Sequence, residues 1–326
     1  MRSILKKLVS ILTPCFNGAM YLPSFLDSII CQTYRPIEFI FIDDGSTDET
    51  YNVFHSYEGL LSSAGINVQY IYQSNAGQAA AINKGLAIFH GEYLMWVDSD
   101  DILLPNNIEV KVQCLESNLK IGFVLSEGLI VDECDINSVK GRLQRIEKEP
   151  YDRVNLFKDY ILGHNVVYGP GTVLVRRDAL FKAIPSRSIY ESKQGQNWQL
   201  MLPLSYTFDY CLINQPLFKY VVHHDSHSHK RLDYYDEIER LSGFEEIIVN
   251  TIKCIPSMPI EEIPEWIKMT NIAILQKKFQ TACLFNRFID ACHYSKALGK
   301  LKRLSFEEYI LGYELYRIRR KLDRLL

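Results

Sequence analysis

The feature that most limits the fold is the regular alternation of strand and helix patterns over residues 1–125. Short apolar runs predict buried strands at 8–12, 37–42, 68–72, 93–97 and 121–125. Apolar residues at helical spacing lie between these runs, at 22–30, 77–89 and 104–115. Strands that alternate with helices through short connections predict an α/β fold, in which a mostly parallel sheet carries helices on both faces.

The rest of the chain differs in character from this first segment. Residues 126–230 are less regular, with a strand pattern at 172–175 and a helix pattern that opens at 195–198. From Asp233 onward, Tyr, Ile, Leu and Lys recur at helical spacing and glycines are few. We therefore expect three segments, 1–125, 126–230 and 231–326, of which the last is a helical extension.

Polar residues follow three of the predicted strands directly, at 13–17, 43–46 and 98–101. The carboxyl ends of parallel strands lie at one edge of a sheet, and ligands of open α/β folds bind at that edge. The three polar segments are therefore expected to face a single ligand site.

Acidic residues dominate two of these segments. Asp98 and Asp100, one residue apart, are suited to a hard divalent cation such as Mg²⁺ or Mn²⁺, which prefers oxygen ligands and keeps positions open for phosphates. The alternative is a turn cluster before the next helix. Asp43 and Asp44 leave a similar choice open, between tight-turn chemistry and acceptors for a base N–H or a ribose hydroxyl. Phe16 is placed to flank a nucleobase.

Several classes of protein are disfavoured by features that the sequence lacks. No G-x-G-x-x-G follows the first strand and no Walker-type phosphate loop occurs, which argues against a dinucleotide-binding oxidoreductase and a P-loop enzyme. The net charge of −3 gives no general attraction to nucleic acid. No apolar run reaches the roughly 18 residues that predict a membrane span. The 8 cysteines are scattered, which favours reduced thiols over a disulfide framework.

Five linked segments resemble family-two glycosyltransferases. They are VSILTPCFN at 9–17, SIICQTY at 28–34, FIDDGSTD at 41–48, NAGQAAAINKG at 75–85 and GEYLMWVDSDD at 91–101. The resemblance covers about residues 8 to 115 in order and spacing, and it weakens beyond residue 130. It implies a GT-A fold, which is Rossmann-like, and an inverting transfer of a sugar from a nucleoside diphosphate to a hydroxyl acceptor. The three segments would then be a donor-binding half, an acceptor-binding half of the same domain, and the helical C-terminal extension.

The resemblance also implies roles for individual residues. The donor would be bound by Pro14, Phe16, Asp43, Asp44, Gln78, Asp98 and Ser99. A divalent cation, Mn²⁺ or Mg²⁺, would be held by Asp98, Asp100 and His223. The alternative for His223 is a solvated His-rich loop, and a zinc site is disfavoured because no cysteine is near and the spacing is poor.

The sequence departs from the family at the general base. The family usually supplies it from an acidic pair before a Trp-bearing helix, and here Gln196 and Asn197 precede Trp198. Amides do not accept a proton at neutral pH. Three alternatives remain open. Another carboxylate replaces the pair, with Glu191 the nearest in sequence and Asp209 the next; the acceptor oxygen needs little activation; or the protein is a non-catalytic nucleotide-sugar-binding protein.

We expect a working enzyme. Its catalytic residues would be Asp100, Glu191 and Asn197, and Gln196 and Trp198 would face the acceptor. Trp198 is equally consistent with stacking on a sugar and with ordinary burial.

The resemblance implies a UDP-, GDP- or dTDP-linked donor and a saccharide or lipid-linked saccharide acceptor, with no nucleic acid. The setting would be bacterial surface polysaccharide synthesis in the cytoplasm, at the inner face of the membrane. The tail from Lys300 to Leu326 holds eight Lys and Arg against four Asp and Glu, with leucines near helical spacing. It fits an interfacial helix on anionic lipid, or a helix that docks on its own domain or on a second copy in a homodimer.

Overall fold

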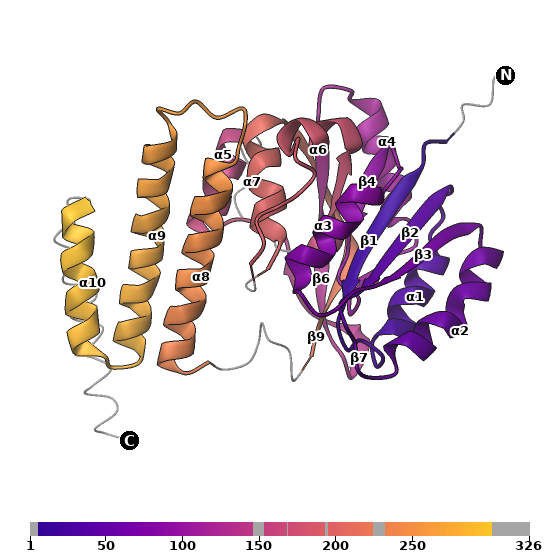
Figure 1. Ribbon diagram of the computed structural model, residues 1–326, viewed down its shortest axis with the longest axis horizontal. Helices are drawn as coiled ribbons and strands as arrows, with labels where there is room; N and C mark the ends of the chain where they lie inside the picture. Colours follow the sequence, from indigo (N-terminus) through magenta and orange to yellow (C-terminus); the bar gives the residue numbers. More distant parts are fainter. Residues whose placement is uncertain (1–5, 146–152, 168, 193–194, 224–231, 302–326) are drawn as a thin grey trace. The chain divides into compact units, whose positions relative to one another are not determined.

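The computed structural model describes residues 6–145, 153–167, 169–192, 195–223 and 232–301. These residues form two compact units, which are described separately. The first contains the described residues up to His223 together with Ile255–Ser257 and carries the sheet (Figure 1). The second contains the helices of the described C-terminal part.

The sheet of the first unit has nine strands in the order β3-β2-β1-β4-β8-β6-β9-β5, and β7 pairs with β6. The strands are β1 (Val9–Cys15), β2 (Ile37–Asp43), β3 (Ile66–Tyr72), β4 (Tyr93–Trp96), β5 (Ile102–Leu103), β6 (Phe123–Asp132), β7 (Asp135–Leu143), β8 (Val173–Arg176) and β9 (Tyr210–Val222). β1, β2 and β4 are buried along their whole length, as expected of parallel strands covered on both faces. The predicted α/β class and the four N-terminal strands are confirmed.

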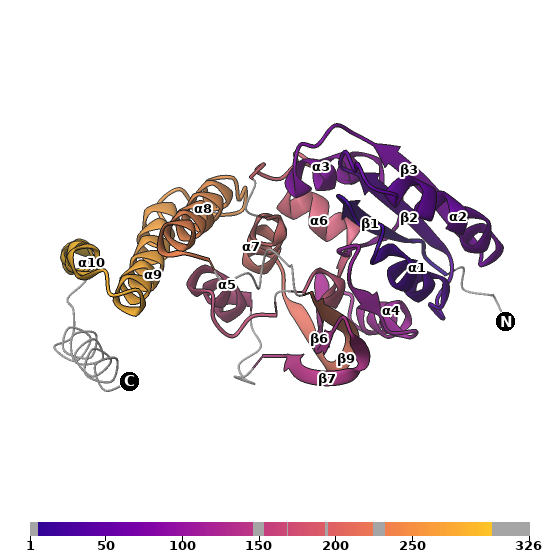
Figure 2. The same cartoon turned by 90° about the horizontal axis from the view of Figure 1, so that it is seen from below.

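Helices cover both faces of the N-terminal half of this sheet (Figures 1 and 2). The helices of the first unit are α1 (Leu22–Ile30), α2 (Thr50–Ser63), α3 (Gln78–Ile88), α4 (Asn107–Ser117), α5 (Arg153–Leu162), α6 (Arg177–Ala183) and α7 (Asn197–Thr207), with a short 3₁₀ turn at Pro170–Thr172. Phe25 of α1, Phe54 of α2 and Leu115 of α4 share one buried cluster with Ile11 of β1. α3 packs on the opposite face, so closely that a Cβ on Gly85 would lie 2.1 Å from a methyl carbon of Leu12.

The strand directions decide where the polar loops gather. β1 runs parallel to β2 and to β4. β8 is antiparallel both to β4 and to β6, so β6 runs in the same direction as β4. β9 is parallel to β6 and lies beside it (Figure 2). The carboxyl ends of β1, β2, β4, β6 and β9 therefore lie at the same edge of the sheet.

The middle of the chain is more regular than its sequence suggests. The strand pattern expected at 121–125 is the start of β6, which continues to Asp132 and folds back as β7. The hairpin escaped prediction because β7 is mostly exposed and polar and carries little apolar periodicity. The helix expected from 104 begins at Asn107, because Ile102–Leu103 instead pair with β9 as the short strand β5.

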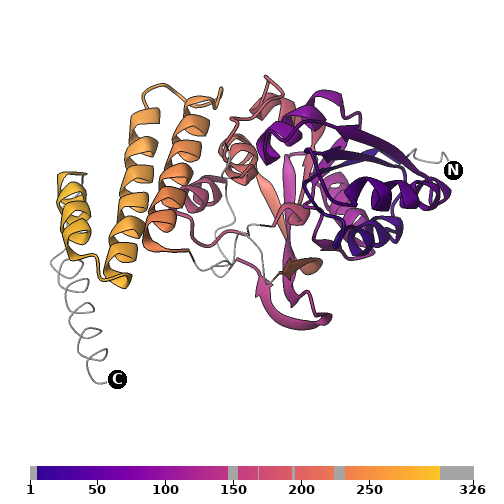
Figure 3. The same ribbon diagram turned by 60° about the horizontal axis from the view of Figure 1, so that its bottom comes forward.

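The second unit is helical, as the sequence predicted. It contains α8 (Tyr234–Lys253), α9 (Ile263–Leu284) and α10 (Phe288–Leu301), and Figure 3 shows α8 and α9 side by side. The Asp233 carboxylate accepts a hydrogen bond from the backbone N–H of Asp236 at 2.9 Å and caps α8. An ion pair of 3.0 Å between Lys278 and Glu245 ties α9 to α8.

The sequence predicted no membrane span and reduced cysteines, and both predictions concern features that the described residues show. Among the residues that the structure describes, no helix is long and apolar enough to span a membrane. All eight cysteines lie in the described ranges, and each is a free thiol. The basic tail that fits a lipid surface or a second copy lies, beyond Leu301, outside the described residues.

Candidate active site

The loops that follow β1 and β2 are held together by direct hydrogen bonds. The Asn17 side-chain oxygen accepts from the backbone N–H of Thr47 at 2.8 Å, and the Asn17 backbone N–H donates to the Ser46 hydroxyl at 2.9 Å. The backbone N–H of Gly18 donates to the Thr50 hydroxyl at 2.9 Å. Asn17 has a φ of 51°, a left-handed conformation that asparagine tolerates better than most residues. The two loops therefore form one rigid rim.

Within this rim, Pro14 and Phe16 have different surroundings. Pro14 is buried in β1 opposite Ile42, whereas 52% of the Phe16 side chain is exposed. Ser99 hydrogen-bonds the thiol between them, that of Cys15, and burial raises the pKa of this thiol to about 12. Cys15 is thus a neutral packing residue, and Phe16 presents the open aromatic surface at this point.

Asp43 and Asp44 are both buried and both accept hydrogen bonds from the protein. Asp43 accepts from the Ser46 backbone N–H at 2.8 Å and from the Tyr70 hydroxyl. Asp44 accepts from the Gln73 amide at 2.6 Å and from two backbone N–H groups of the loop before α3, those of Ala76 at 2.9 Å and Gly77 at 2.8 Å. A carboxylate has about four lone-pair positions, so Asp44 retains capacity for about one more donor.

Asp98 follows β4 and is held by two amides from distant parts of the chain. Gln78, the first residue of α3, donates to Asp98 Oδ1 at 2.7 Å, and Gln196, just before α7, donates to the same oxygen at 3.3 Å. Gln196 is 2% exposed. The structure thus brings the predicted donor residues Gln78 and Asp98 together with the predicted acceptor residue Gln196.

The two acids of the D-x-D segment influence each other. Burial and the nearby Asp100 carboxylate raise the pKa of Asp98 to about 7. Burial also raises the pKa of Asp100, and the opposing influence of His223 lowers it. The two carboxylates repel each other when both are ionised. A bound cation would offset this repulsion, because it stabilises the charged form of each.

His223 follows β9 at the same edge and faces Asp100. Its Nε2 lies 3.6 Å from Asp100 Oδ2, and its Nδ1 lies 2.9 Å from Glu133 Oε2. The ring is 4% exposed and packs on Tyr21 with 3.9 Å between ring centroids. Nε2 is buried and has no hydrogen-bond partner among the described residues. His223 is therefore a fixed side chain of this edge and not a member of a solvated loop.

Asp101 connects the acidic loop to β9. It is 1% exposed, and its Oδ1 accepts from the Val221 backbone N–H at 3.1 Å. Burial, together with the charges of Asp100 and Asp98, raises the pKa of Asp101 well above its usual value. The sequence placed Asp101 in the polar segment 98–101 without a role of its own, and it gave no signal for Glu133, which stands outside every motif segment.

The first residues of α7 have structural partners as well. The Asn197 side-chain oxygen lies 3.4 Å from the indole nitrogen of the buried Trp96 and accepts its N–H. The indole of Trp198 donates to the Tyr160 carbonyl of α5 at 3.0 Å. Trp198 therefore anchors α5 to α7 through its polar end and is only partly buried.

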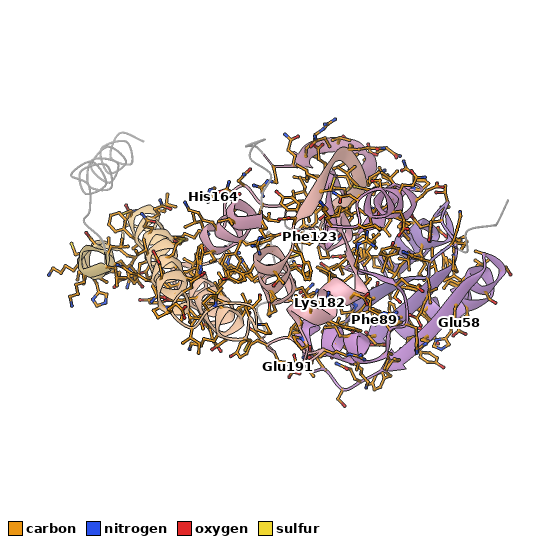
Figure 4. All side chains as sticks on the ribbon, turned by 90° about the horizontal axis from the view of Figure 1, so that it is seen from above. Glu58, Phe89, Phe123, His164, Lys182 and Glu191 are labelled. Atoms are coloured by element: carbon orange, nitrogen blue, oxygen red, sulfur yellow. The ribbon has the colours of Figure 1, made fainter. Side chains whose placement is uncertain are left out.

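The two carboxylates considered as substitutes for the missing acidic pair lie in different places. Glu191 is exposed and accepts a hydrogen bond from Asn83 of α3 at 3.1 Å (Figure 4). Among the described residues, no hydrogen bond joins Glu191 to Asp98 or Asp100. Asp209 precedes β9, and its carbonyl accepts from Gly122, the residue before β6. Since β6 and β9 are parallel, Asp209 lies at the edge of the sheet opposite Asp98.

The residues at this edge fit a cation that takes only some of its ligands from the protein. Within the described ranges, no group of three or more His, Cys, Asp or Glu side chains is arranged to hold a metal ion. Asp100 and the unpartnered Nε2 of His223 offer an oxygen and a nitrogen ligand, while Asp98 Oδ1 is occupied by amides. Mg²⁺ and Mn²⁺ commonly take one or two protein ligands and complete their shell with phosphate oxygens and water. The donor set therefore suits a cation bound together with a diphosphate.

A mostly parallel sheet that gathers Asp98, Asp100, the exposed Phe16 and the buried His223 at its carboxyl edge has the arrangement of the GT-A class of α/β proteins. The model of the glycosyl transferase family 2 matches residues 10–184. An uncharacterized glycosyltransferase of Rickettsia typhi is 32% identical over 242 residues, which is 73% of this chain and 71% of that protein. The chain therefore belongs to glycosyltransferase family 2 and is an enzyme of that family.

Other relatives match over a shorter stretch. An uncharacterized glycosyltransferase of Rickettsia prowazekii is 39% identical over 114 residues, which is 35% of this chain and 34% of that protein. The family model, by comparison, covers residues 10–184, which include Asp98 and Asp100 but neither Gln196 nor His223.

Solved structures agree with this fold. The structure of TarS 1–349 of S. aureus in complex with UDP-GlcNAc has a TM-score of 0.56 at 16% identity, over 90% of this chain and 91% of that one. The mannosyltransferase PcManGT of Pyrobaculum calidifontis, in complex with GDP-Man and Mn²⁺, has a TM-score of 0.56 at 15% identity, over 97% of this chain and 83% of that one. At such identities the likeness shows the GT-A fold alone.

Proposed function

We propose that this enzyme transfers a sugar from a nucleoside-diphosphate sugar to a hydroxyl acceptor, with the help of a divalent cation and with inversion at the anomeric carbon. The observation that carries the proposal is the buried Nε2 of His223, which lies 3.6 Å from Asp100 Oδ2 and has no hydrogen-bond partner among the described residues. The complexes of TarS with UDP-GlcNAc and of PcManGT with GDP-Man and Mn²⁺ support this assignment of substrate and cofactor.

On the donor side, each residue has a role that follows from its position. Phe16 borders the base with its exposed ring, and Pro14 fixes the strand end behind it. Asp43 and Asp44 order the loops around the base and ribose, and Asp44 has capacity for about one more donor. Gln78 holds Asp98 in place next to the diphosphate, and Ser99 lies between the two acids of the pair.

Asp100 and His223 would hold the divalent cation, which would supply electrostatic stabilisation of the charge on the leaving diphosphate. The protein's contribution is to hold the buried His223 ring 3.6 Å from the Asp100 carboxylate, which is 40% exposed and therefore open to a ligand. Asp98 keeps its own carboxylate oriented through Gln78 and Gln196.

On the acceptor side, we propose that Glu191 takes the proton of the acceptor hydroxyl. It is an exposed carboxylate near the start of α7, and Asn83 holds it. The acceptor then contacts the start of α7, at Gln196, Asn197 and Trp198. If Glu191 is the base, Glu191→Gln lowers kcat by about 10²-fold or more and leaves donor binding unchanged.

We further propose a saccharide or lipid-linked saccharide acceptor of bacterial surface polysaccharide synthesis, met at the inner face of the membrane. The support is the family and its bacterial relatives. Basic residues of the tail are suited to contact with anionic lipid.

The proposal is tested with a thermal-shift panel of UDP, GDP and dTDP and their sugars, each with and without Mn²⁺. One base is expected to raise Tm strongly, and only when Mn²⁺ is present, because a ligand that binds the folded state alone stabilises it. The anomeric configuration of the product, read by NMR, tests inversion. A Tm unchanged by every nucleotide with Mn²⁺, or a product with retained configuration, would refute the corresponding part of the proposal.

The raised pKa of Asp98 predicts a pH dependence of cation binding. Below about pH 7 the Asp98 carboxyl is mostly protonated, so affinity for Mn²⁺ is expected to fall by up to about tenfold per pH unit from pH 7 to 6 and to level off above pH 8. Calorimetric titration of Mn²⁺ at pH 6, 7 and 8 measures this. Asp98→Asn, which keeps the acceptor oxygen for Gln78 and Gln196, is the matched variant and is expected to bind weakly at every pH.

The same pKa has the opposite consequence for stability without metal. Because the folded-state pKa of Asp98 lies above its ordinary value of 3.8, its contribution to stability is full below about pH 4 and is lost as the pH rises through 7. Metal-free Asp98→Asn is therefore expected to melt above the wild type at pH 8, with the difference shrinking at pH 5. Equal melting temperatures at both pH values would contradict the burial of this charge.

A further inference from the structure

Glu133 is the first residue after β6, and its side chain meets His223 across 90 positions of sequence. The parallel pairing of β6 with β9 places Asp132 opposite Val222, so the residues that follow the two strands lie side by side. Glu133 Oε2 is 2.9 Å from His223 Nδ1, a hydrogen-bonding distance. The Glu133 side chain is 19% exposed and that of His223 5% exposed, so water competes little for this bond.

The bond has a chemical consequence for the imidazole ring. A neutral imidazole carries its proton on one nitrogen and offers a lone pair on the other. A carboxylate can only accept, so Nδ1 carries the proton and Nε2 presents the lone pair. Nε2 is the atom that is buried without a hydrogen-bond partner among the described residues, and it faces Asp100 Oδ2 at 3.6 Å. Tyr21 packs against the ring and hinders its rotation.

We propose that Glu133 is a positioning residue that fixes His223 in its Nδ1–H tautomer and thereby holds Nε2 as the nitrogen ligand for the divalent cation beside Asp100. The inference rests on the proposed function, since it assumes that His223 binds a cation. Glu133 touches neither donor nor cation, and it acts through the orientation and basicity of the ring.

The first test is the tautomer itself, observed by NMR of the full chain with ¹⁵N-labelled histidine, without metal and above pH 8. Wild type is expected to show the Nδ1–H form of His223, and Glu133→Ala is expected to shift the signal toward the Nε2–H form. Asp135→Ala is the matched control. It removes the same charge from the neighbouring exposed start of β7 and is expected to leave the tautomer unchanged.

The second test is Mn²⁺ affinity, measured by calorimetry without donor. Glu133→Ala is expected to weaken binding by about 10–100-fold, as loss of an outer partner of a metal-binding histidine commonly does, while Asp135→Ala stays at the wild-type value. Glu133→Gln keeps the side-chain volume and is used if the alanine variant does not fold. Its amide is a weaker acceptor than a carboxylate, so its affinity is expected between those of wild type and Glu133→Ala.

The two readouts separate the failure of this inference from that of the proposed function. If wild type does not bind Mn²⁺ at all, the metal role of His223 is wrong, and the tautomer experiment still tests the bond to Glu133. If wild type binds Mn²⁺ and the Glu133 variants keep both the tautomer and the affinity, the positioning role of Glu133 is overturned while the proposed function stands.

Discussion

Replacement of Asp100 with alanine is expected to reduce kcat/KM for sugar transfer by at least about 10³-fold, equivalent to about 4 kcal/mol of transition-state stabilisation. The substitution removes the carboxylate that faces His223 Nε2 at 3.6 Å. The proposed cation beside His223 would then lose this oxygen ligand. Steady-state kinetics with the donor found in the thermal-shift panel, and release of nucleoside diphosphate in Mn²⁺, measure the loss.

Melting temperatures show whether the loss of activity in Asp100→Ala comes from unfolding. Asp100 raises the pKa of Asp98, so its removal relieves repulsion, and metal-free Asp100→Ala is expected to melt no lower than wild type. Asp209→Ala, which removes an exposed carboxylate at the opposite edge of the sheet, is expected to keep wild-type kinetics. Substantial turnover by Asp100→Ala would remove the basis for cation assistance at this site.

Replacement of Asp44 with alanine is expected to lower stability by about 3 kcal/mol, or roughly 6–12 °C in Tm, and to weaken donor binding as well. The carboxylate accepts from the side chain of Gln73 and from the backbone N–H groups of Ala76 and Gly77, and it is 4% exposed. Its loss leaves these donors without their acceptor and frees the loop that leads into α3. Thermal and denaturant unfolding measure the change.

Phe16→Ala is the contrasting variant for this experiment. Phe16 lies at the same edge, but its side chain is 52% exposed, so its removal is expected to leave Tm within about 1 °C while weakening nucleotide binding by about 1–3 kcal/mol through lost stacking. If Asp44→Ala behaves like Phe16→Ala, with intact stability and weak binding, Asp44 serves the ligand directly and its bonds to the loop are secondary.

Local pattern was enough to predict the strands of residues 1–125. The strands at 8–12, 37–42, 68–72 and 93–97 are apolar runs that end in polar loops, and a parallel sheet needs no further information to bring those ends together. This is why Asp98, Asp100 and the loop at Asn17 could be assigned to one edge from the sequence. The C-terminal helices were predictable for the same reason, because their apolar residues recur at helical spacing.

What escaped prediction depends on pairing between distant strands. Glu133 reaches His223 because β6 runs parallel to β9 in a register that no local signal encodes. The partners of Gln196 and Asn197 were hidden in the same way, since they are Asp98 and Trp96 on the far side of the chain in sequence. The sequence shows these amides only as a departure from the family's acidic pair, whereas the structure gives both of them defined hydrogen bonds.

The hydrogen bond from Gln196 to Asp98 joins a residue of the proposed acceptor site to a carboxylate of the proposed donor site. Kinetic constants for the two substrates are consequently expected to be coupled, so that a variant made to broaden acceptor choice at the start of α7 also changes donor KM. Attempts to redirect this enzyme toward new acceptors have a safer starting point in the exposed side chains of α5, Val154 and Lys158, because the buried side chains of α5 and the bond from Trp198 to the Tyr160 backbone are then left unchanged.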